Sequence, residues 1–451
     1  MEARTAMFSL AAWNRFKAGR LPDADFMRQL VAYGLSVIGT MVGSLVLVLV
    51  LVRLLPAEEY GGVVLTKISL LVVVSLGGLG LSQAAVRWVG FKQRPELVLG
   101  TVLAGVALSS VPAAVVMICV AAVFADYLGL TPGLLLFAAI VALVPSYLLN
   151  NELLNWPRAM HQARRHAVLN TARALEQLSF VTAGVLWTGN ANGFIYGLAA
   201  GELAFMTGLV ITRRERLAFD AGLLGKMLGY GWPHTTVIAS SFLLTYVDRY
   251  MLAFLTSDTT AVAYYDAAYV LVGSALALLV RPFNLFLFPA YTRRYAEQGE
   301  QATVHLVNKA QDLFLLAGLG VATLMVLLRQ PMLEWLYPAG YGNAASIFAA
   351  VAYGTLMNGV FMATVAGLYI SNRTMMVGAA ALAALAVNIF ANWLLIPRWG
   401  IDGAAASTAL AGFVQVAVGY YCSRRILPVK LPVAWLGIGA VWLGLVQWAS
   451  T

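Results

Sequence analysis

The chain has 451 residues, of which 61% are apolar and only 11% are charged, and its mean hydropathy is +0.80. A water-soluble protein of this composition would lack enough polar residues to cover its surface, so that class is excluded. The net charge of +9 is typical of basic segments that flank membrane spans, and it does not indicate a nucleic-acid partner. The composition therefore predicts an all-α polytopic membrane protein.

The first 26 residues contain the stretch "FSLAAWNRFKAGRL". Basic and apolar residues alternate here without the continuous apolar core of a secretory signal. This pattern predicts an amphipathic helix on the cytoplasmic membrane surface.

Thirteen apolar stretches follow, each long enough to cross a hydrocarbon core about 30 Å thick. They are predicted at 31–52, 61–86, 97–124, 133–155, 169–188, 193–212, 230–255, 264–290, 310–328, 344–370, 374–396, 403–422 and 432–449. The last is short and ends at the terminus, so its crossing is the weakest prediction.

Basic residues orient these spans. With a cytoplasmic N-terminus, 23 of the 29 lysines and arginines fall in cytoplasmic segments and three in outer loops. This asymmetry predicts a cytoplasmic N-terminus in a bacterial plasma membrane.

The basic linker "TRRERLAFDAGLLGK" divides the first twelve spans into six and six. An even number of spans gives both halves the same orientation, so we expect two six-helix lobes related by a pseudo-twofold axis along the membrane normal. The predicted organisation is an N-lobe at 27–212, a linker at 213–229, a C-lobe at 230–423 and an extra helix at 424–451. Near the end of each lobe, a glycine turn precedes a helix of small residues, which permits close helix packing.

Several short motifs recur in an order that resembles one known family. They are "RLLPAEEYG" at 53–61, "GGLGLSQAAVRW" at 77–88, "YGWP" at 230–233, "DRYML" at 248–252, "AYYDAAYVL" at 263–271, "RPFNLFLFPAYTR" at 281–293 and "LLIPRWGIDGAAAST" at 394–408. Their order and spacing are similar to those of the O-antigen type polysaccharide flippases of the multidrug/oligosaccharidyl-lipid/polysaccharide (MOP) exporter superfamily. The resemblance covers 27–423, although members of that family often have twelve or fourteen spans.

This resemblance implies a transporter, not an enzyme, that moves an undecaprenyl-diphosphate-linked glycan to the outer face of the membrane. A diphosphate sugar head cannot cross hydrocarbon unaided, so a polar, cationic cavity between the lobes is expected. The implied partners are this lipid-linked glycan and membrane lipids, with a polysaccharide polymerase and glycosyltransferases as candidate protein partners. No cofactor is expected.

Two cations inside spans are the leading candidates for substrate binding. Arg281 lies about 14 Å from the inner end of its span, too deep to extend easily to the surface, and the resemblance implies a cavity-facing arginine on this helix. The alternative is an arginine that bonds carbonyl groups freed by Pro282. Lys67 lies on the equivalent span of the first half, about 9 Å below Gly61, and the alternative is a lysine that extends to the outer surface.

Arg249 and Asn284 complete the predicted substrate-binding set. Asp248, Glu202 and Glu176 are candidates for gating or ion coupling, because ionisable groups inside a membrane are costly. The alternative for each is a structural hydrogen bond between helices. Asp248 and Arg249 point about 100° apart on a helix, so we do not expect a simple mutual pair. Each is expected either to bond a neighbouring helix or to act in gating on the outer side.

No metal site is predicted, because the cysteines lie inside apolar runs and the histidines lack ligand spacing: Cys119, Cys422, His161, His166, His234 and His305. Two other functions were weighed. A drug or cation antiporter of the same superfamily would need carboxylates in the first four spans, which contain only Glu152 near a cytoplasmic end. A membrane glycan polymerase or ligase would need a large outer loop, and none exceeds about 16 residues.

Overall fold

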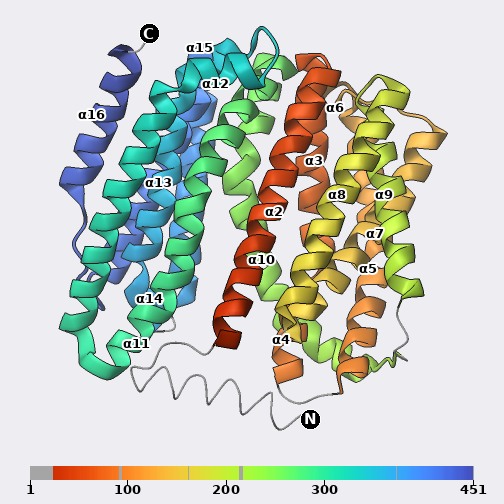
Figure 1. Ribbon diagram of the computed structural model, residues 1–451, viewed down its shortest axis with the longest axis horizontal. Coiled ribbons are helices and arrows are strands. Elements are labelled where there is room, and N and C mark those ends of the chain that lie inside the picture. Colours follow the sequence, from red (N-terminus) through yellow and green to blue (C-terminus); the bar gives the residue numbers. More distant parts are fainter. Residues whose placement is uncertain (1–23, 91–93, 161, 213–216, 372, 450–451) are drawn as a thin grey trace.

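The computed structural model of the protein describes residues 24–90, 94–160, 162–212, 217–371 and 373–449. Residues 1–23, most of the predicted amphipathic segment, lie outside the described residues. Every regular element in the described part of the chain is a helix, which confirms the all-α prediction (Figure 1).

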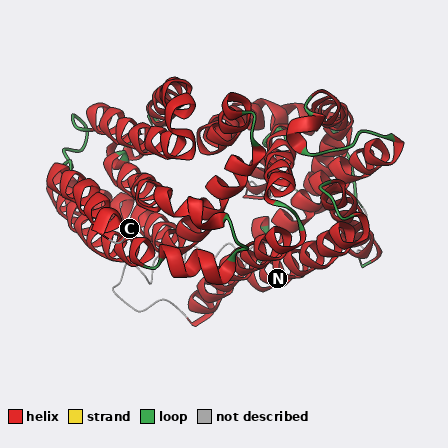
Figure 2. Cartoon of the chain, turned by 90° about the horizontal axis from the view of Figure 1, so that it is seen from above, coloured by secondary structure: helices red, strands yellow, loops and turns green. Residues whose placement is uncertain are grey.

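The helices form two bundles that lie side by side in Figure 1. The N-terminal bundle contains α2 (Ala24–Leu54), α3 (Ala57–Gly77), α4 (Leu81–Gly90), α5 (Pro95–Val123), α6 (Ala125–Leu128), α7 (Leu134–Ala159), α8 (Ala163–Thr188) and α9 (Asn192–Ile211). The C-terminal bundle contains α10 (Ala221–Thr256), α11 (Thr259–Leu327), α12 (Arg329–Leu336), the 3₁₀ helix η1 (Tyr341–Ile347), α13 (Phe348–Thr364), α14 (Ala366–Ile370), α15 (Thr374–Ser423) and α16 (Val433–Ala449). Seen from above, short loops join helices throughout (Figure 2).

The two ends of the molecule are distinguished by their short helices. α6 and α12 lie at the upper end in Figure 1, and α4 and α14 lie at the lower end. We name these the α6–α12 face and the α4–α14 face. Main helices run between the two faces, as expected for a membrane-spanning chain (Figure 1).

Apart from 61–86 and 344–370, each predicted span falls on a helix or on one arm of a helix. The span predicted at 344–370 is not one continuous helix, because it is divided among η1, α13 and α14. Seven described helices are long and apolar enough to cross a bilayer by length and composition alone. The two longest, α11 and α15, are each two helices merged across a kink, at Gly299 (φ 78°) and Gly400 (φ 53°). Glycine tolerates such positive φ values, so these two positions divide long helical stretches into separate crossings.

The prediction of one continuous span over 61–86 is wrong. Helix α3 ends at Gly77, and α4 begins at Leu81. Leu79 (φ 50°) and Gly80 (φ 66°) between them adopt left-handed conformations that interrupt the helix. A side chain at Gly80 would place its Cβ 2.2 Å from the carbonyl oxygen of Gly231, so α10 packs directly against this break.

The last predicted span is a helix, α16, attached to the C-terminal bundle. Trp442 donates to Thr323 of α11 at 2.9 Å, and the Gln447 side-chain oxygen accepts from the Ala349 N–H of α13 at 2.9 Å. These bonds hold the middle and the C-terminal end of α16 against neighbouring helices.

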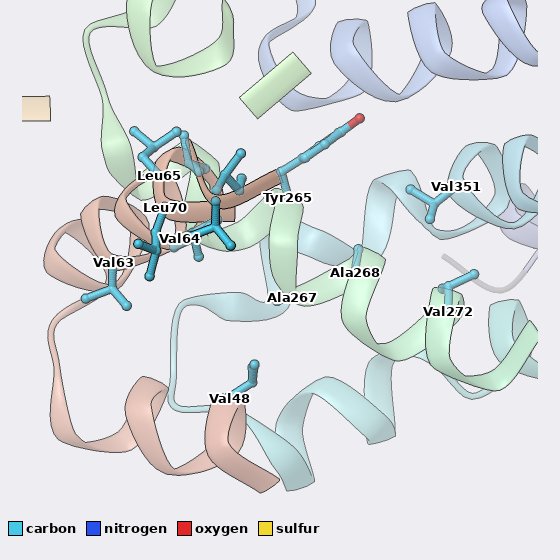
Figure 3. Packing of buried hydrophobic residues seen from close by; sticks show 14 of the residues in the cluster. Val48, Val63, Val64, Leu65, Leu70, Tyr265, Ala267, Ala268, Val272 and Val351 are labelled. Carbon is cyan, nitrogen blue, oxygen red and sulfur yellow. The ribbon is translucent and has the colours of Figure 1, made fainter. Parts of the chain in front are cut away.

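One continuous apolar core runs through both bundles. It includes Val64 and Leu65 of α3, together with Tyr265 and Ala268 of α11 (Figure 3). The bundles are therefore packed against each other in this conformation.

Helices α8 and α9 approach closely through glycines, as the small-residue pattern predicted. A Cβ at Gly197 would lie 2.2 Å from the Phe180 carbonyl oxygen, and one at Gly184 would lie 2.3 Å from the Gly193 carbonyl oxygen. Backbone atoms leave no room for a side chain at these positions.

Gly197→Val is expected to destabilise the protein by about 1 to 3 kcal/mol, because overpacking must separate two backbones. The measurement is thermal unfolding of purified protein in detergent. Gly208→Val on the same helix is the matched control, since nothing lies within 4 Å of a Cβ there. Equal unfolding temperatures for the two variants would contradict this account of the interface.

Candidate functional site

Helix α3 lies between the two bundles and is the most buried of the candidate spans. It packs against α5, α6 and α7 on one side and against α10 and α11 on the other. Ser69 of α3 is 2.8 Å from the hydroxyl of Tyr250 on α10, so the contact includes polar groups.

Lys67 is exposed, although the α3 residues on both sides of it are buried. Leu71 and Ser75, one and two turns further along, are partly exposed. The spacing of four places all three on one side of the helix. This central helix therefore has one open face, and Lys67 supplies its positive charge.

Arg281 lies on α11 and is exposed. It is within electrostatic range of Tyr246 on α10, whose ring stacks on Phe242 at a centroid distance of 5.8 Å. Asn284, three residues after Arg281, has a buried side-chain oxygen without a hydrogen-bond partner in the described structure. Arg281 and Asn284 lie on adjacent turns of one helix, so they form a polar patch next to α10.

Lys67 and Arg281 are connected through α10. Tyr250, which contacts Ser69 of α3, lies one turn from Tyr246, which is near Arg281. Among the residues that the structure describes, neither Lys67 nor Arg281 has an ion-pair partner. Two uncompensated positive charges thus flank the same helix where the bundles meet.

Asp248, Arg249 and Asp266 form a buried charge cluster in the C-terminal bundle. An Arg249 Nη1 atom lies 3.0 Å from Asp248 Oδ1, and Nη2 lies 3.5 Å from Asp266 Oδ1. Asp248 and Arg249 therefore contact each other, but they are not a simple mutual pair, because Arg249 also contacts Asp266 of α11. Their Cα–Cβ vectors diverge, but the arginine side chain is long enough to fold back onto its neighbour.

Aromatic rings surround this arginine. Its guanidinium carbon lies 4.3 Å from the ring centroid of Tyr269 and 5.1 Å from that of Tyr265. Tyr265 donates to Asp248 at 2.5 Å, and Thr408 of α15 donates to the same carboxylate at 3.3 Å. Arg249 is only 2% exposed, and both of its Nη atoms face carboxylates, so it is not accessible to a substrate in this structure.

Glu202 and Arg173 form a second buried cluster, in the N-terminal bundle. Arg173 Nη2 lies 2.7 Å from Glu202 Oε1, and Nε donates to the same oxygen at 2.9 Å. Gln177 donates to that oxygen at 2.8 Å, and Asn150 donates to the other at 2.7 Å. Glu202 is fully buried, and two Arg173 donors converge on one of its oxygens, so this cluster joins α7, α8 and α9 structurally.

Glu176 lies one turn from Arg173, and both of its carboxylate oxygens are buried without a hydrogen-bond partner in the described structure. A Cβ at Gly201 would lie 1.7 Å from one of them, so the carboxylate occupies space that only glycine leaves open. The structure brings Glu176 of α8 within electrostatic range of Glu202 of α9.

Sequence reasoning missed several members of these clusters. Asp266 is near the start of its predicted span, where a carboxylate can reach the membrane surface and so does not indicate a buried site. In the structure it accepts from Tyr60 of α3 at 3.1 Å. The Asn150–Asn151 pair inside an apolar span was the available signal for the N-terminal cluster. Arg173 Nη1 donates to Asn151 at 2.5 Å.

The sequence profile of the polysaccharide biosynthesis protein family matches residues 50–346. A curated relative, an uncharacterized membrane protein of Methanocaldococcus jannaschii, is 23% identical over 233 residues, which cover 49% of this chain. The chain spans about half the length of that relative, since the match covers 45% of it.

Solved structures share the fold. The lipid II flippase MurJ in an inward closed conformation has a TM-score of 0.65 at 13% identity, over 93% of this chain and 92% of that one. An inward-facing multidrug resistance MATE transporter of the MOP superfamily has a TM-score of 0.67 at 12% identity, over 94% and 100%. A MOP superfamily transporter from Pyrococcus furiosus, described as having a binding pocket of reverse polarity, has a TM-score of 0.63 at 12% identity, over 88% and 94%.

Proposed function

This chain belongs to the polysaccharide biosynthesis protein family, and on that premise we propose that it is a flippase for an undecaprenyl-diphosphate-linked oligosaccharide or polysaccharide repeat unit. It is a multi-pass membrane transporter with the MOP-superfamily fold, not an enzyme. In the proposal, the two bundles act as pseudo-twofold-related lobes with the boundaries predicted above, and transport occurs by alternating access between them.

The observation that supports this proposal is the pair of exposed cations, Lys67 and Arg281, on helices of different bundles. A diphosphate carries negative charge that hydrocarbon cannot solvate, and it binds arginine and lysine through charge-assisted hydrogen bonds. The side-chain oxygen of Asn284, near Arg281, is buried without a partner, so it would accept from a sugar hydroxyl once the bundles separate. Together these groups match the head of a lipid-linked glycan, whose polyprenyl tail would stay in the bilayer.

The α4–α14 face is the cytoplasmic side in this proposal, because the basic segments gather there. An inside-negative potential then favours outward movement of the anionic head by about 2.3 kcal/mol per charge per 100 mV. Ion coupling through Glu176 or Glu202 is an additional element of the proposal, supported by the buried, unpartnered carboxylate of Glu176.

Reconstituted protein should translocate a fluorescent polyprenyl-diphosphate-linked sugar in liposomes, and the rate should rise with an imposed potential, negative on the α4–α14 side. The measurement is chemical quenching of the fluorescent sugars that have reached the leaflet opposite to the one in which they started. A fluorescent lipophilic cation in the same liposomes tests the competing antiporter function. Cation transport without movement of the glycan lipid would overturn the flippase assignment.

A further inference from the structure

The bundles are joined at the α6–α12 face by contacts between α3 and α11. Thr259 at the start of α11 donates to the Glu58 carbonyl oxygen at 3.0 Å. A Cβ at Gly61 would lie 1.9 Å from the Thr259 carbonyl oxygen, so the two backbones touch. Nearby, Arg53 donates to the Trp335 carbonyl oxygen at 3.4 Å. This end of the interface is closed in the structure.

One side-chain hydrogen bond lies beneath these backbone contacts. Tyr60, only 2% exposed on α3, donates to Asp266 Oδ2 on α11 at 3.1 Å. A buried bond to a carboxylate is stronger than one between neutral groups, and losing either member leaves the other unsatisfied. The tyrosine therefore ties the N-terminal bundle to a charged group of the C-terminal bundle.

The acceptor is held in place from the other side. Asp266 contacts Arg249, Arg249 contacts Asp248, and Asp248 accepts from Thr408 of α15. This chain of contacts crosses α11, α10 and α15 and ends at Tyr60 of α3. The charge cluster thus positions one carboxylate oxygen toward the partner bundle.

The aromatic residues above Asp266 seal the same region. Burial, followed by the nearby Asp266 carboxylate, raises the pKa of Tyr337, so its hydroxyl stays protonated at physiological pH. The Tyr337 ring lies 5.1 Å from that of Tyr341, which lies 5.1 Å from that of Tyr264. These packed rings cover Asp266 on the α6–α12 side. In the described structure, the donor that reaches Asp266 Oδ2 from the N-terminal bundle is Tyr60.

We infer that the Tyr60–Asp266 hydrogen bond is a latch that keeps the α6–α12 face closed, and that this face opens when the bond breaks. The inference rests on the alternating-access part of the proposed function. Lys67 lies seven residues beyond Tyr60, about 10 Å deeper along α3, so the latch separates the proposed binding site from the α6–α12 side.

The test uses a reporter cysteine beneath the latch. In a background where Cys119 and Cys422 are replaced with alanine, Lys67→Cys is labelled with a membrane-impermeant maleimide from the α6–α12 side. Tyr60→Phe keeps the buried ring and removes only the donor, so the open population and the labelling rate should rise about five-fold. Tyr353→Phe is the matched control, because its hydroxyl bonds the Leu436 carbonyl oxygen within one bundle.

An unchanged labelling rate in Tyr60→Phe would overturn the latch. A second measurement covers a variant that folds poorly: a Glu58→Cys and Thr259→Cys pair, oxidised to a disulfide, should abolish labelling, and reduction should restore it. Continued labelling of the disulfide-linked protein would also contradict the latch. Because labelling needs no substrate, failure of glycan transport by the protein with Lys67 intact, together with intact latch behaviour in the labelling variants, would refute the flippase and leave the latch standing.

Discussion

Replacing Arg281 with alanine is expected to lower transport of the diphosphate-linked glycan about tenfold or more. A hydrogen bond to a charged group contributes about 1.5 to 3 kcal/mol, and the variant removes this contribution at the point where the anion is least solvated. Arg281 is exposed and has no ion-pair partner in the described structure, so its truncation should leave the fold intact. The measurements are surface glycan in cells and translocation in liposomes.

Two controls make this result specific. Arg281→Lys keeps the charge but loses the planar, bidentate donor, so its activity should fall between those of the parent and of alanine. Arg293, on the same helix, forms an exposed ion pair with Glu297 at 2.9 Å. The Arg293→Ala variant should transport the glycan lipid at close to the parental rate. Full surface glycan in Arg281→Ala would show that this arginine does not bind the substrate head.

The membrane spans could be predicted because their signal is local. A run of apolar residues of sufficient length must be helical in lipid, whatever it packs against. The break after Gly77 was not predicted, because "GGLG" is apolar and glycine is common in membrane helices. What fixes the break is the contact between Gly80 and Gly231, two positions far apart in the chain.

The clusters were only half predictable for the same reason. Ionisable residues inside spans are conspicuous, so Asp248, Arg249 and Glu202 could be singled out as candidates. Their partners could not, since the Tyr60–Asp266 bond joins residues 206 positions apart. For Asp248 and Arg249, the directions of the Cα–Cβ bonds alone do not predict the contact, because the long arginine side chain folds back onto its neighbour.

Arg173 shows why a buried charge can be recognised but not interpreted from sequence. Its position lies near the inner end of the predicted span 169–188, where an arginine can extend to the surface. In the structure it is buried, and its guanidinium carbon lies 4.3 Å from the ring centroid of Tyr147. The partner that makes this burial possible is Glu202, on the next helix.

Glu202→Ala is therefore expected to destabilise the protein by about 3 to 5 kcal/mol, because it leaves the Arg173 guanidinium buried without its counter-charge. In the same variant Gln177 loses its acceptor, and Asn150 keeps only the backbone carbonyl oxygen of residue 202, which adds unsatisfied donors to the same interior. The measurement is thermal unfolding of the purified protein, together with its yield in the membrane fraction.

Glu202→Gln separates charge from hydrogen bonding. The amide keeps a carbonyl acceptor of similar size but no negative charge, so its stability should lie between those of the parent and of Glu202→Ala. Glu297→Ala removes a carboxylate from the exposed pair with Arg293 and should cost less than about 1 kcal/mol. If Glu202→Ala unfolds at the temperature of Glu297→Ala, Glu202 does not hold α8 and α9 together, and its burial beside Glu176 would instead favour a role in ion coupling.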